Sequence, residues 1–194
     1  ASIQAARMQV YFIDNDDFFT RRQMYGDEKG YYQDNIERCV FFARGVIETI
    51  RKLRWKPDVV YCQGWFSAIA PVYIKKGFAE DPCFRGTKLV FSVFANDFTG
   101  PLHGNVYSVV KREGILKADI IELKEKNIDY TAFCRVATKF CDGLIIADDT
   151  PENALVAEFA KSRGIPVLDA TDSELRTEMY DEFFEQFNPD NEED

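Results

Sequence analysis

The sequence lacks the glycine-rich signatures of the common phosphate-binding loops. Neither GxGxxG nor GxxxxGK[ST] occurs in its 194 residues, so nothing favours a dinucleotide-binding or P-loop protein. Histidine occurs once, at His103, and the cysteines form no CxxC pair. Zinc sites need several such ligands at short spacings, so we expect no metal and no cofactor. The odd number of cysteines indicates free thiols in a reducing cytoplasm.

The sequence is also short of basic side chains and of long hydrophobic runs. Its 24 Lys and Arg against 33 Asp and Glu give a net charge of −9. Proteins that bind nucleic acids or anionic membranes need clustered Lys and Arg, so we expect neither partner. No apolar run approaches the ~20 residues of a membrane-spanning helix, and Ala1 to Arg7 lacks the layout of a signal peptide. We therefore predict a cytoplasmic protein.

What is present is a regular alternation of short apolar runs and amphipathic stretches. Hydrophobic residues make up 46% and charged residues 29%, as in a globular domain. The apolar runs predict strands at Met8–Ile13, Asp58–Cys62, Lys88–Phe94, Gly143–Ala147 and Ile165–Leu168. The intervening stretches predict helices from Asp34 to before Pro57, at Trp65–Lys76, at Val106–Glu113, at 128–141, from Thr150-Pro151 to Gly164, and after Thr171 with Glu174 as its capping partner.

This order predicts an α/β Rossmann-like layered fold, with a mostly parallel sheet flanked by helices. Residues 1–187 are expected to form one domain, and 188–194 an acidic disordered tail. Ligands of such sheets bind beyond the carboxyl ends of the strands. The loops of interest are therefore Asp14–Asp17, Gln63–Phe66, Ala95–Gly100 and Asp148–Thr150.

The clearest helix begins at Asp34, which we expect to cap it with Glu37 as the reciprocal partner. Apolar residues then recur at steps of three and four, which predicts one buried face. They are Ile36, Val40, Ala43, Ile47, Ile50 and Leu53. Cys134 and Cys141, seven apart on a later predicted helix, are expected to share a buried face.

Three acidic or histidine features admit a catalytic interpretation beside a structural one. Asp14-Asn15-Asp16 after an apolar run resembles the signature of haloacid-dehalogenase phosphatases, although Phe18 stands where that family has Thr or Val. The Asp148-Asp149 pair precedes Thr150-Pro151, which favours helix capping. His103 lies in a Gly/Pro-rich loop without a serine or cysteine nucleophile nearby, which favours a surface residue.

Residues 8–77 carry an ordered succession of short motifs. They are Val10-Tyr-Phe-Ile-Asp14, Tyr25-Gly-Asp27, Asp34-Asn-x-x-Arg38, Trp55-x-Pro-Asp-Val-Val60, Gly64-Trp65 and Ala70-Pro-x-Tyr-x-Lys75. This succession resembles the N-terminal catalytic domain of bacterial glycogen and plant starch synthases. The likeness continues more loosely through Lys88–Phe94 and Phe140–Thr150.

The resemblance implies the N-terminal half of a GT-B glycosyltransferase, in which two Rossmann-like domains face each other across a cleft. The family transfers glucose from ADP-glucose or a related nucleotide sugar to an α-1,4-glucan, with retention and without a metal. Its N-terminal domain chiefly holds the glucan. Carried over to this sequence, the residues that bind an α-glucan or maltooligosaccharide acceptor would be Tyr25, Asp34, Asn35, Arg38 and Trp65.

Three departures from the family pattern bear on catalysis. The family's His-Asp-Trp-His-like turn is replaced by Gln63-Gly64-Trp65-Phe66, so Phe66 stands where the family has a catalytic histidine. The opening Lys-x-Gly-Gly loop and the C-terminal nucleotide-sugar domain have no counterpart in these 194 residues. We therefore expect no catalytic residue here and no activity of the chain alone. The alternatives are a divergent synthase fragment that acts with a second glycosyltransferase domain, or a non-catalytic relative that binds glucan or a synthase.

Overall fold

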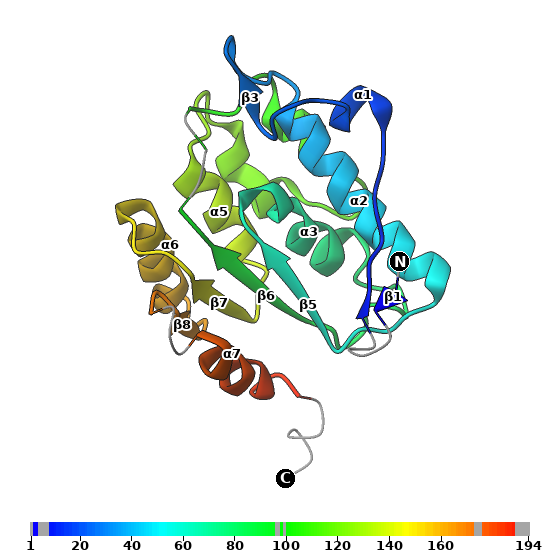
Figure 1. Cartoon of the computed structure of the whole chain (residues 1–194), viewed down its shortest axis with the longest axis vertical. Helices are drawn as coiled ribbons and strands as arrows, with labels where there is room; N and C mark the ends of the chain where they lie inside the picture. Colours follow the sequence, from blue (N-terminus) through cyan, green and yellow to red (C-terminus); the bar gives the residue numbers. More distant parts are fainter. Residues whose placement is uncertain (1, 4–7, 96–97, 99, 173–175, 189–194) are drawn as a thin grey trace.

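The structure is a computed structural model that describes residues 2–3, 8–95, 98, 100–172 and 176–188. At its centre lies a parallel sheet in the order β5-β6-β7-β8 (Figure 1). Its strands are β5 (Val59–Gln63), β6 (Lys88–Val93), β7 (Gly143–Ile146) and β8 (Val167–Asp169). Two small antiparallel hairpins lie outside this sheet: β1 (Ser2–Ile3) with β2 (Met8–Gln9), and β3 (Gly26–Asp27) with β4 (Gly30–Tyr31).

Helices connect the parallel strands. The α-helices are α1 (Asp16–Phe19), α2 (Asn35–Leu53), α3 (Ile69–Val72), α4 (Val106–Val110), α5 (Tyr130–Thr138), α6 (Pro151–Ser162) and α7 (Arg176–Glu185). Two short 3-10 segments, η2 (Trp65–Ser67) and η4 (Lys117–Lys124), and the π-helical turn η3 (Tyr73–Gly77) complete the set. None of the described helices is both long enough and apolar enough to cross a lipid bilayer.

The main hydrophobic core lies between one face of the sheet and helices α2 to α6. Leu89, Phe91 and Val93 alternate along β6 and point into this core, where each is fully buried. Val90 points to the opposite face and is equally buried, so β6 is apolar on both sides. A strand covered on both faces reads as a continuous apolar run, as Lys88–Phe94 does in the sequence.

The second face of the sheet has a thinner cover. There Val90 and Ile145 pack against Phe183 and Phe187, and α7 is the helix that lies across this face in Figure 1. Tyr61 of β5 joins the same layer through an edge-on contact with Phe184, at 5.2 Å between ring centroids. The helices are therefore distributed unequally over the two faces.

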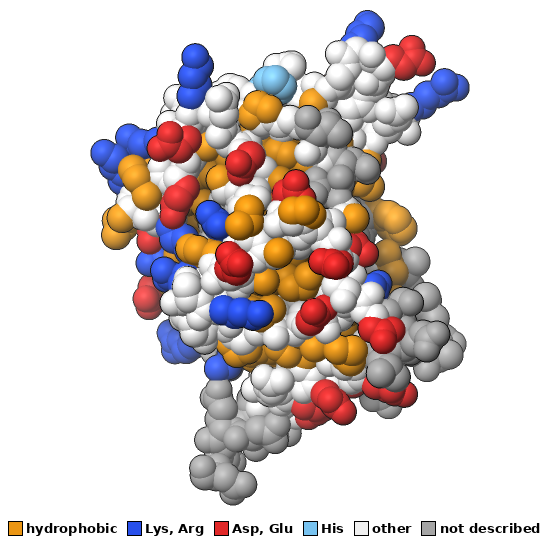
Figure 2. All heavy atoms as spheres, turned by 90° about the vertical axis from the view of Figure 1, so that its left-hand side faces the viewer, with side chains coloured by type: hydrophobic (Ala, Val, Ile, Leu, Met, Phe, Trp, Pro, Cys, Tyr) orange, Lys and Arg blue, Asp and Glu red, His pale blue; other side chains and the backbone are white. Residues whose placement is uncertain are grey.

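The surface agrees with the acidic composition. Figure 2 shows the side of the molecule that lies to the left in Figure 1, where acidic, basic and hydrophobic side chains intermingle. No uniformly basic area is seen on that face.

The predicted fold class is confirmed, but the strand predicted at Met8–Ile13 is wrong. Only Met8 and Gln9 form a strand, and they pair with Ser2–Ile3 outside the parallel sheet. The run continues without regular structure, with Phe12 84% exposed. Ile13 then packs on α2 at Gly45, where an added Cβ would come within 2.8 Å of its Cγ2. An apolar run predicts burial against something, but here only Val10 and Ile13 are partly buried, and Ile13 packs against a helix.

Two smaller predictions are wrong, and two others concern residues that the structure does not describe. Asp34 is the N-cap residue of α2, but its side chain makes no capping hydrogen bond. Helix α5 ends at Thr138, so Cys141 is not on the same helix as Cys134, although both are buried. Glu174, the expected capping partner of Thr171, and 189–194 of the predicted tail lie outside the described residues.

Candidate functional site

The candidate site lies beside the carboxyl ends of β5 and β6. The backbone N–H of Gly64 donates to the Ser92 carbonyl at 2.9 Å, and the chain then turns into η2. A hollow of about 360 Å³ opens at this turn. It is lined by Met24, Tyr25, Gln63, Gly64, Trp65, Phe94, Ala95 and Tyr130. Open α/β sheets bind their ligands at this edge, so the hollow is where a ligand is expected.

Gly64 is required by the backbone of this turn. Its φ of 68° and ψ of 167° fall in a region that essentially only glycine adopts. No atom would lie within 4 Å of an added Cβ, so space does not limit the residue type. The sequence comparison with the family placed Gly64 where an acidic residue is usual, and the turn conformation explains why glycine suits this chain.

We predict that Gly64→Ala lowers the free energy of unfolding by about 1–3 kcal/mol through backbone strain alone. Urea-induced unfolding measures the change. Gly77→Ala is the matched control, because the nearest atom to a Cβ added at Gly77 would lie at 3.6 Å, an ordinary contact, and its φ is not positive. Equal stability of the two variants would contradict a role for backbone strain at the turn.

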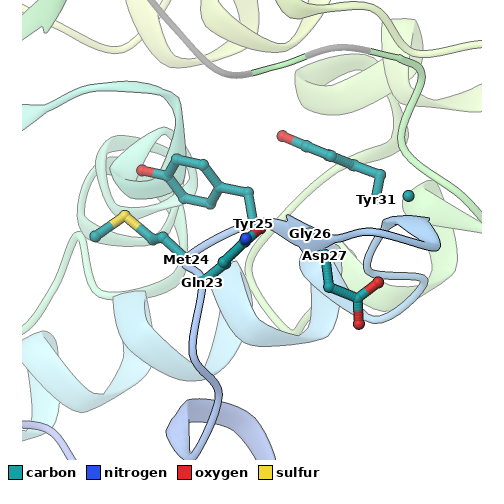
Figure 3. Close-up of a pocket in the computed structure, with 7 residues that line it drawn as sticks. Gln23, Met24, Tyr25, Gly26, Asp27 and Tyr31 are labelled. Atoms are coloured by element: carbon teal, nitrogen blue, oxygen red, sulfur yellow. The ribbon is translucent and has the colours of Figure 1, made fainter.

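A second hollow, of about 490 Å³, adjoins the first at the β3–β4 hairpin. Its walls are formed by Gln23, Met24, Tyr25, Gly26, Asp27, Gly30 and Tyr31. Figure 3 shows the rings of Tyr25 and Tyr31 rising on the same side of the hairpin, with Asp27 directed to the other side. Met24 and Tyr25 line both hollows, so they separate two neighbouring subsites.

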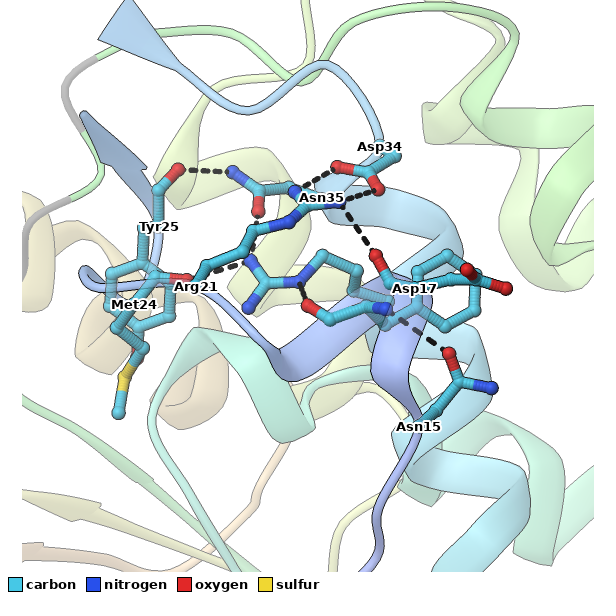
Figure 4. A network of polar contacts seen from close by, with 9 residues as sticks. Asn15, Asp17, Arg21, Met24, Tyr25, Asp34 and Asn35 are labelled. Carbon is cyan, nitrogen blue, oxygen red and sulfur yellow. Dashed lines mark hydrogen bonds and ion pairs between the residues drawn. The ribbon is translucent and has the colours of Figure 1, made fainter. Parts of the chain in front are cut away.

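Arg38 and Asn35 lie behind Tyr25 and anchor its loop from the protein interior. Arg38 is 3% exposed and donates to the carbonyls of Phe18 at 2.9 Å and Met24 at 2.7 Å, and to Asn35 Oδ1 at 2.6 Å. Asn35, 1% exposed, donates from Nδ2 to the Tyr25 carbonyl at 2.8 Å (Figure 4). Burial lowers the pKa of the Arg38 guanidinium, and the charge of Arg21 adds to this effect. These two predicted binding residues therefore position the Tyr25 loop from beneath.

Asp34 is held by an arginine that the sequence did not identify. The two terminal guanidinium nitrogens of Arg21 donate to the Asp34 carboxylate, Nη1 to Oδ1 at 2.8 Å and Nη2 to Oδ2 at 2.6 Å. Arg21 also donates to the Asp17 carbonyl (Figure 4). Its guanidinium stacks on the Tyr32 ring, 4.6 Å from the ring centroid. The Arg21 hydrogen bond holds the pKa of Asp34 below its usual range, whereas partial burial acts in the opposite direction. The carboxylate expected to contact sugar is thus engaged in an ion pair.

This ion pair should make the stability of the protein depend on acid pH. A carboxyl with a lowered pKa in the folded state stabilises the fold above its unfolded pKa near 3.8 and loses that contribution as the pH falls through its folded pKa. We predict that Asp34→Asn, which keeps a good N-cap residue, flattens the loss of stability below about pH 4. Thermal unfolding from pH 6 to pH 3 measures this.

The same prediction has a thermodynamic control. If the ion pair is responsible, Arg21→Gln should flatten the acid profile as Asp34→Asn does, and the double variant should add nothing further. Additive effects of the two substitutions would show that the two side chains act independently.

Trp65 and Phe66 form the aromatic floor of the site. Trp65 is 2% exposed and lies 4.7 Å from the Tyr25 ring and 5.0 Å from the Phe98 ring, measured between centroids. Its indole Nε1 is buried and has no hydrogen-bond partner among the described residues. Phe66 packs on Tyr25 and lies 5.4 Å from the Arg38 guanidinium. The position where the family has a histidine is therefore occupied by a side chain without hydrogen-bonding atoms.

The remaining candidates have structural places. Asn15, between Asp14 and Asp16, caps α1 by accepting from the Phe18 N–H at 3.1 Å, and this segment follows no strand of the parallel sheet. The phosphatase geometry, which needs such a strand, is thus missing from this segment. Asp148 accepts from the Ala95 N–H at 2.6 Å, Thr150 caps α6 as predicted, and His103 is exposed.

The five cysteines are free, and four of them are buried. Burial raises the pKa of the Cys62 thiol to about 12 and also raises the pKa values of Cys39, Cys134 and Cys141. A thiol with a raised pKa is a poor nucleophile and a poor metal ligand at neutral pH. These cysteines serve as core residues.

Sequence reasoning missed several residues at the site. Arg21, Met24 and Tyr31 all contribute to it, as does Tyr130, whose hydroxyl donates to Asn153 Oδ1 at 2.8 Å. Two tyrosines six residues apart, each next to a glycine of a Gly26-to-Gly30 turn, were a usable signal for paired rings on a hairpin. No sequence pattern pointed to Arg21 as the partner of Asp34.

A parallel sheet flanked by helices, with hollows beside the carboxyl ends of β5 and β6, defines a Rossmann-like domain. The sequence model of the starch synthase catalytic domain matches residues 1–159. The chain belongs to this family.

Curated relatives carry the name glycogen synthase. That of Thermodesulfovibrio yellowstonii is 38% identical over 91 residues, which cover 47% of this chain and 18% of the relative. That of Koribacter versatilis is 38% identical over 99 residues, 51% of this chain and 20% of the relative. That of Pelodictyon phaeoclathratiforme is 29% identical over 132 residues, 67% and 27% respectively. The chain spans about a fifth to a quarter of the length of these relatives.

Proposed function

We propose that this chain forms the glucan-acceptor side of a glycogen synthase-like glycosyltransferase. The main support for this proposal is the pair of tyrosine rings, Tyr25 and Tyr31, on one side of the β3–β4 hairpin. The hairpin lies beside the hollow at the ends of β5 and β6. Aromatic rings stack on the apolar faces of sugars, and nearby polar atoms hydrogen-bond the hydroxyls. In this proposal Tyr25 and Tyr31 contact the glucan, and Arg38 and Asn35 hold the Tyr25 loop in place.

Trp65 and Asp34 have different roles in the proposed glucan site. The indole N–H of Trp65 is a buried donor next to the hollow and has no partner in the described part of the chain. An unsatisfied buried donor is costly. A sugar hydroxyl that reached it would relieve that cost. Asp34 is partly exposed but paired with Arg21. We infer that it supports the loop and contacts a sugar only at its open edge.

The reaction proposed for the assembled enzyme is transfer of glucose from ADP-glucose to an α-1,4-glucan, as the family resemblance implies. We propose that this chain alone does not catalyse it. Phe66 offers no hydrogen bond to a reacting sugar and is packed into the aromatic floor. A second glycosyltransferase domain or a synthase would then be its partner.

One alternative is a non-catalytic relative that binds glucan or a synthase without taking part in transfer. Phe66 favours it, because this phenylalanine replaces the family's histidine in the very turn that faces the hollow. We also propose a cytoplasmic location, since five free cysteines suit a reducing compartment.

Calorimetric titrations with a maltooligosaccharide and, separately, with ADP-glucose test the proposal. We expect the 194-residue chain to bind the saccharide and not the nucleotide sugar. A β-1,4-linked oligosaccharide of equal length is the control and should bind much more weakly. Nucleotide-sugar binding without saccharide binding would refute the acceptor proposal. Binding of neither, together with capture of a glycogen synthase, would replace it with the partner-binding alternative.

A further inference from the structure

Two arginines lie between a second pair of hollows that shares no lining residue with the Tyr25 site. Arg44, on α2, and Arg112, just after α4, line both of them. One hollow, of about 360 Å³, extends along α2 past Phe41. The other, of about 420 Å³, is walled by Tyr73 and Phe78. The two arginines therefore line the same pair of hollows.

Neither guanidinium has an acidic partner in the described part of the chain. Among the described residues no carboxylate oxygen lies within 4 Å of Arg44 or Arg112, and Arg112 donates a hydrogen bond to the Lys111 carbonyl. Neighbouring cations are paired: Arg51 with Glu48 and Asp81, and Lys76 with Asp119. In a chain with a net charge of −9, two unneutralised arginines beside the same hollows stand out.

The frame that carries these arginines is fixed by buried contacts. The hydroxyl of Tyr73 donates to the Val110 carbonyl at 2.8 Å, which ties η3 to the end of α4 just before Arg112. Gly114 packs so closely on η3 that an added Cβ would come within 2.8 Å of the Lys76 carbonyl oxygen. Burial raises the pKa of Tyr73 to about 12, while the charges of Arg112 and Arg44 act in the opposite direction. Both charges are therefore felt at this buried hydroxyl.

We propose that Arg44 and Arg112 form an anion site for the phosphate group of a small phosphorylated metabolite. Two arginines that line the same hollows can each donate hydrogen bonds from a planar guanidinium to one dianion, which also balances their positive charge. The hollow beside Phe78 has room for the remainder of a sugar phosphate or a nucleotide. Glu37 and Glu48 also line the first hollow, and Glu113 lines the second. None of them forms an ion pair with Arg44 or Arg112 among the described residues, and their charges disfavour a longer polyanion.

Ligand-dependent thermal unfolding of the chain tests the site with inorganic phosphate at constant ionic strength. At a phosphate concentration of about ten times its dissociation constant, we expect the unfolding temperature to rise by about 3–6 °C. Glucose 1-phosphate and ADP are separate arms that distinguish a sugar phosphate from a nucleotide as the source of the phosphate. A larger rise with either than with inorganic phosphate identifies which metabolite fills the hollow.

Substitutions then locate the effect. Arg44→Gln and Arg112→Gln should each weaken phosphate binding about tenfold, and Arg44→Lys should weaken it less because it keeps the charge. Lys52→Gln removes the same charge from an exposed position of α2 that lines none of the hollows, and should leave binding unchanged. The absence of any phosphate effect, or an equal loss in Lys52→Gln, would overturn the proposal. Maltooligosaccharide binding should be unchanged in all these variants, which separates this site from the glucan site.

Discussion

Replacing Arg38 with methionine is expected to lower the free energy of unfolding by about 3 kcal/mol, the largest effect we predict for a polar residue of the site. Arg38 is buried, and its guanidinium satisfies the carbonyls of Phe18 and Met24 and the side chain of Asn35. Methionine fills much of the volume but leaves these acceptors without a donor. Urea denaturation with unchanged m-value would measure the loss.

The matched control for this substitution is Arg44→Met. Arg44 lies on the same helix α2 but is exposed and has no ion pair among the described residues. We expect the free energy of unfolding of the Arg44→Met variant to remain within about 0.5 kcal/mol of that of the unsubstituted protein. Equal stability of the Arg38→Met and Arg44→Met variants would show that the buried hydrogen bonds of Arg38 contribute nothing, and that it does not support the Tyr25 loop.

The parallel sheet could be predicted because its strands are short apolar runs with clear boundaries. Lys88–Val93 is apolar on both faces, and Thr150-Pro151 marks the start of α6 unambiguously. The run at Met8–Ile13 has the same composition but a different outcome. Its neighbours are α2 and a two-residue strand, and a local pattern cannot tell which surface will bury it.

The candidate site was predictable in its residues more than in their roles. The family motifs pointed to Tyr25, Asp34, Asn35, Arg38 and Trp65, and the structure brings all of them to one region between α2 and the end of β5. Which of them face a hollow depends on burial. Asn35 and Arg38 are directed into the protein because the loop 17–25 offers three backbone carbonyls that need donors. Such a demand arises only once the loop is folded.

The division between contacting and supporting residues gives the site its sharpest functional test. We predict that Tyr25→Ala weakens maltooligosaccharide binding at least tenfold, because it removes the ring shared by both hollows. Its backbone carbonyl still accepts from Asn35, so the loop keeps that anchor. Calorimetric titration of the variant with the same saccharide measures the change.

Tyr25→Phe separates stacking from hydrogen bonding at this ring. It retains the face that packs 4.7 Å from Trp65 between ring centroids, so we expect binding within about threefold of the unsubstituted chain if stacking dominates. A loss as large as that of Tyr25→Ala would instead assign the contribution to the hydroxyl. Unchanged binding in Tyr25→Ala would remove this residue from the glucan site. Because phosphate binding at Arg44 and Arg112 shares no residue with this region, it should stay intact in both variants and report that each is folded.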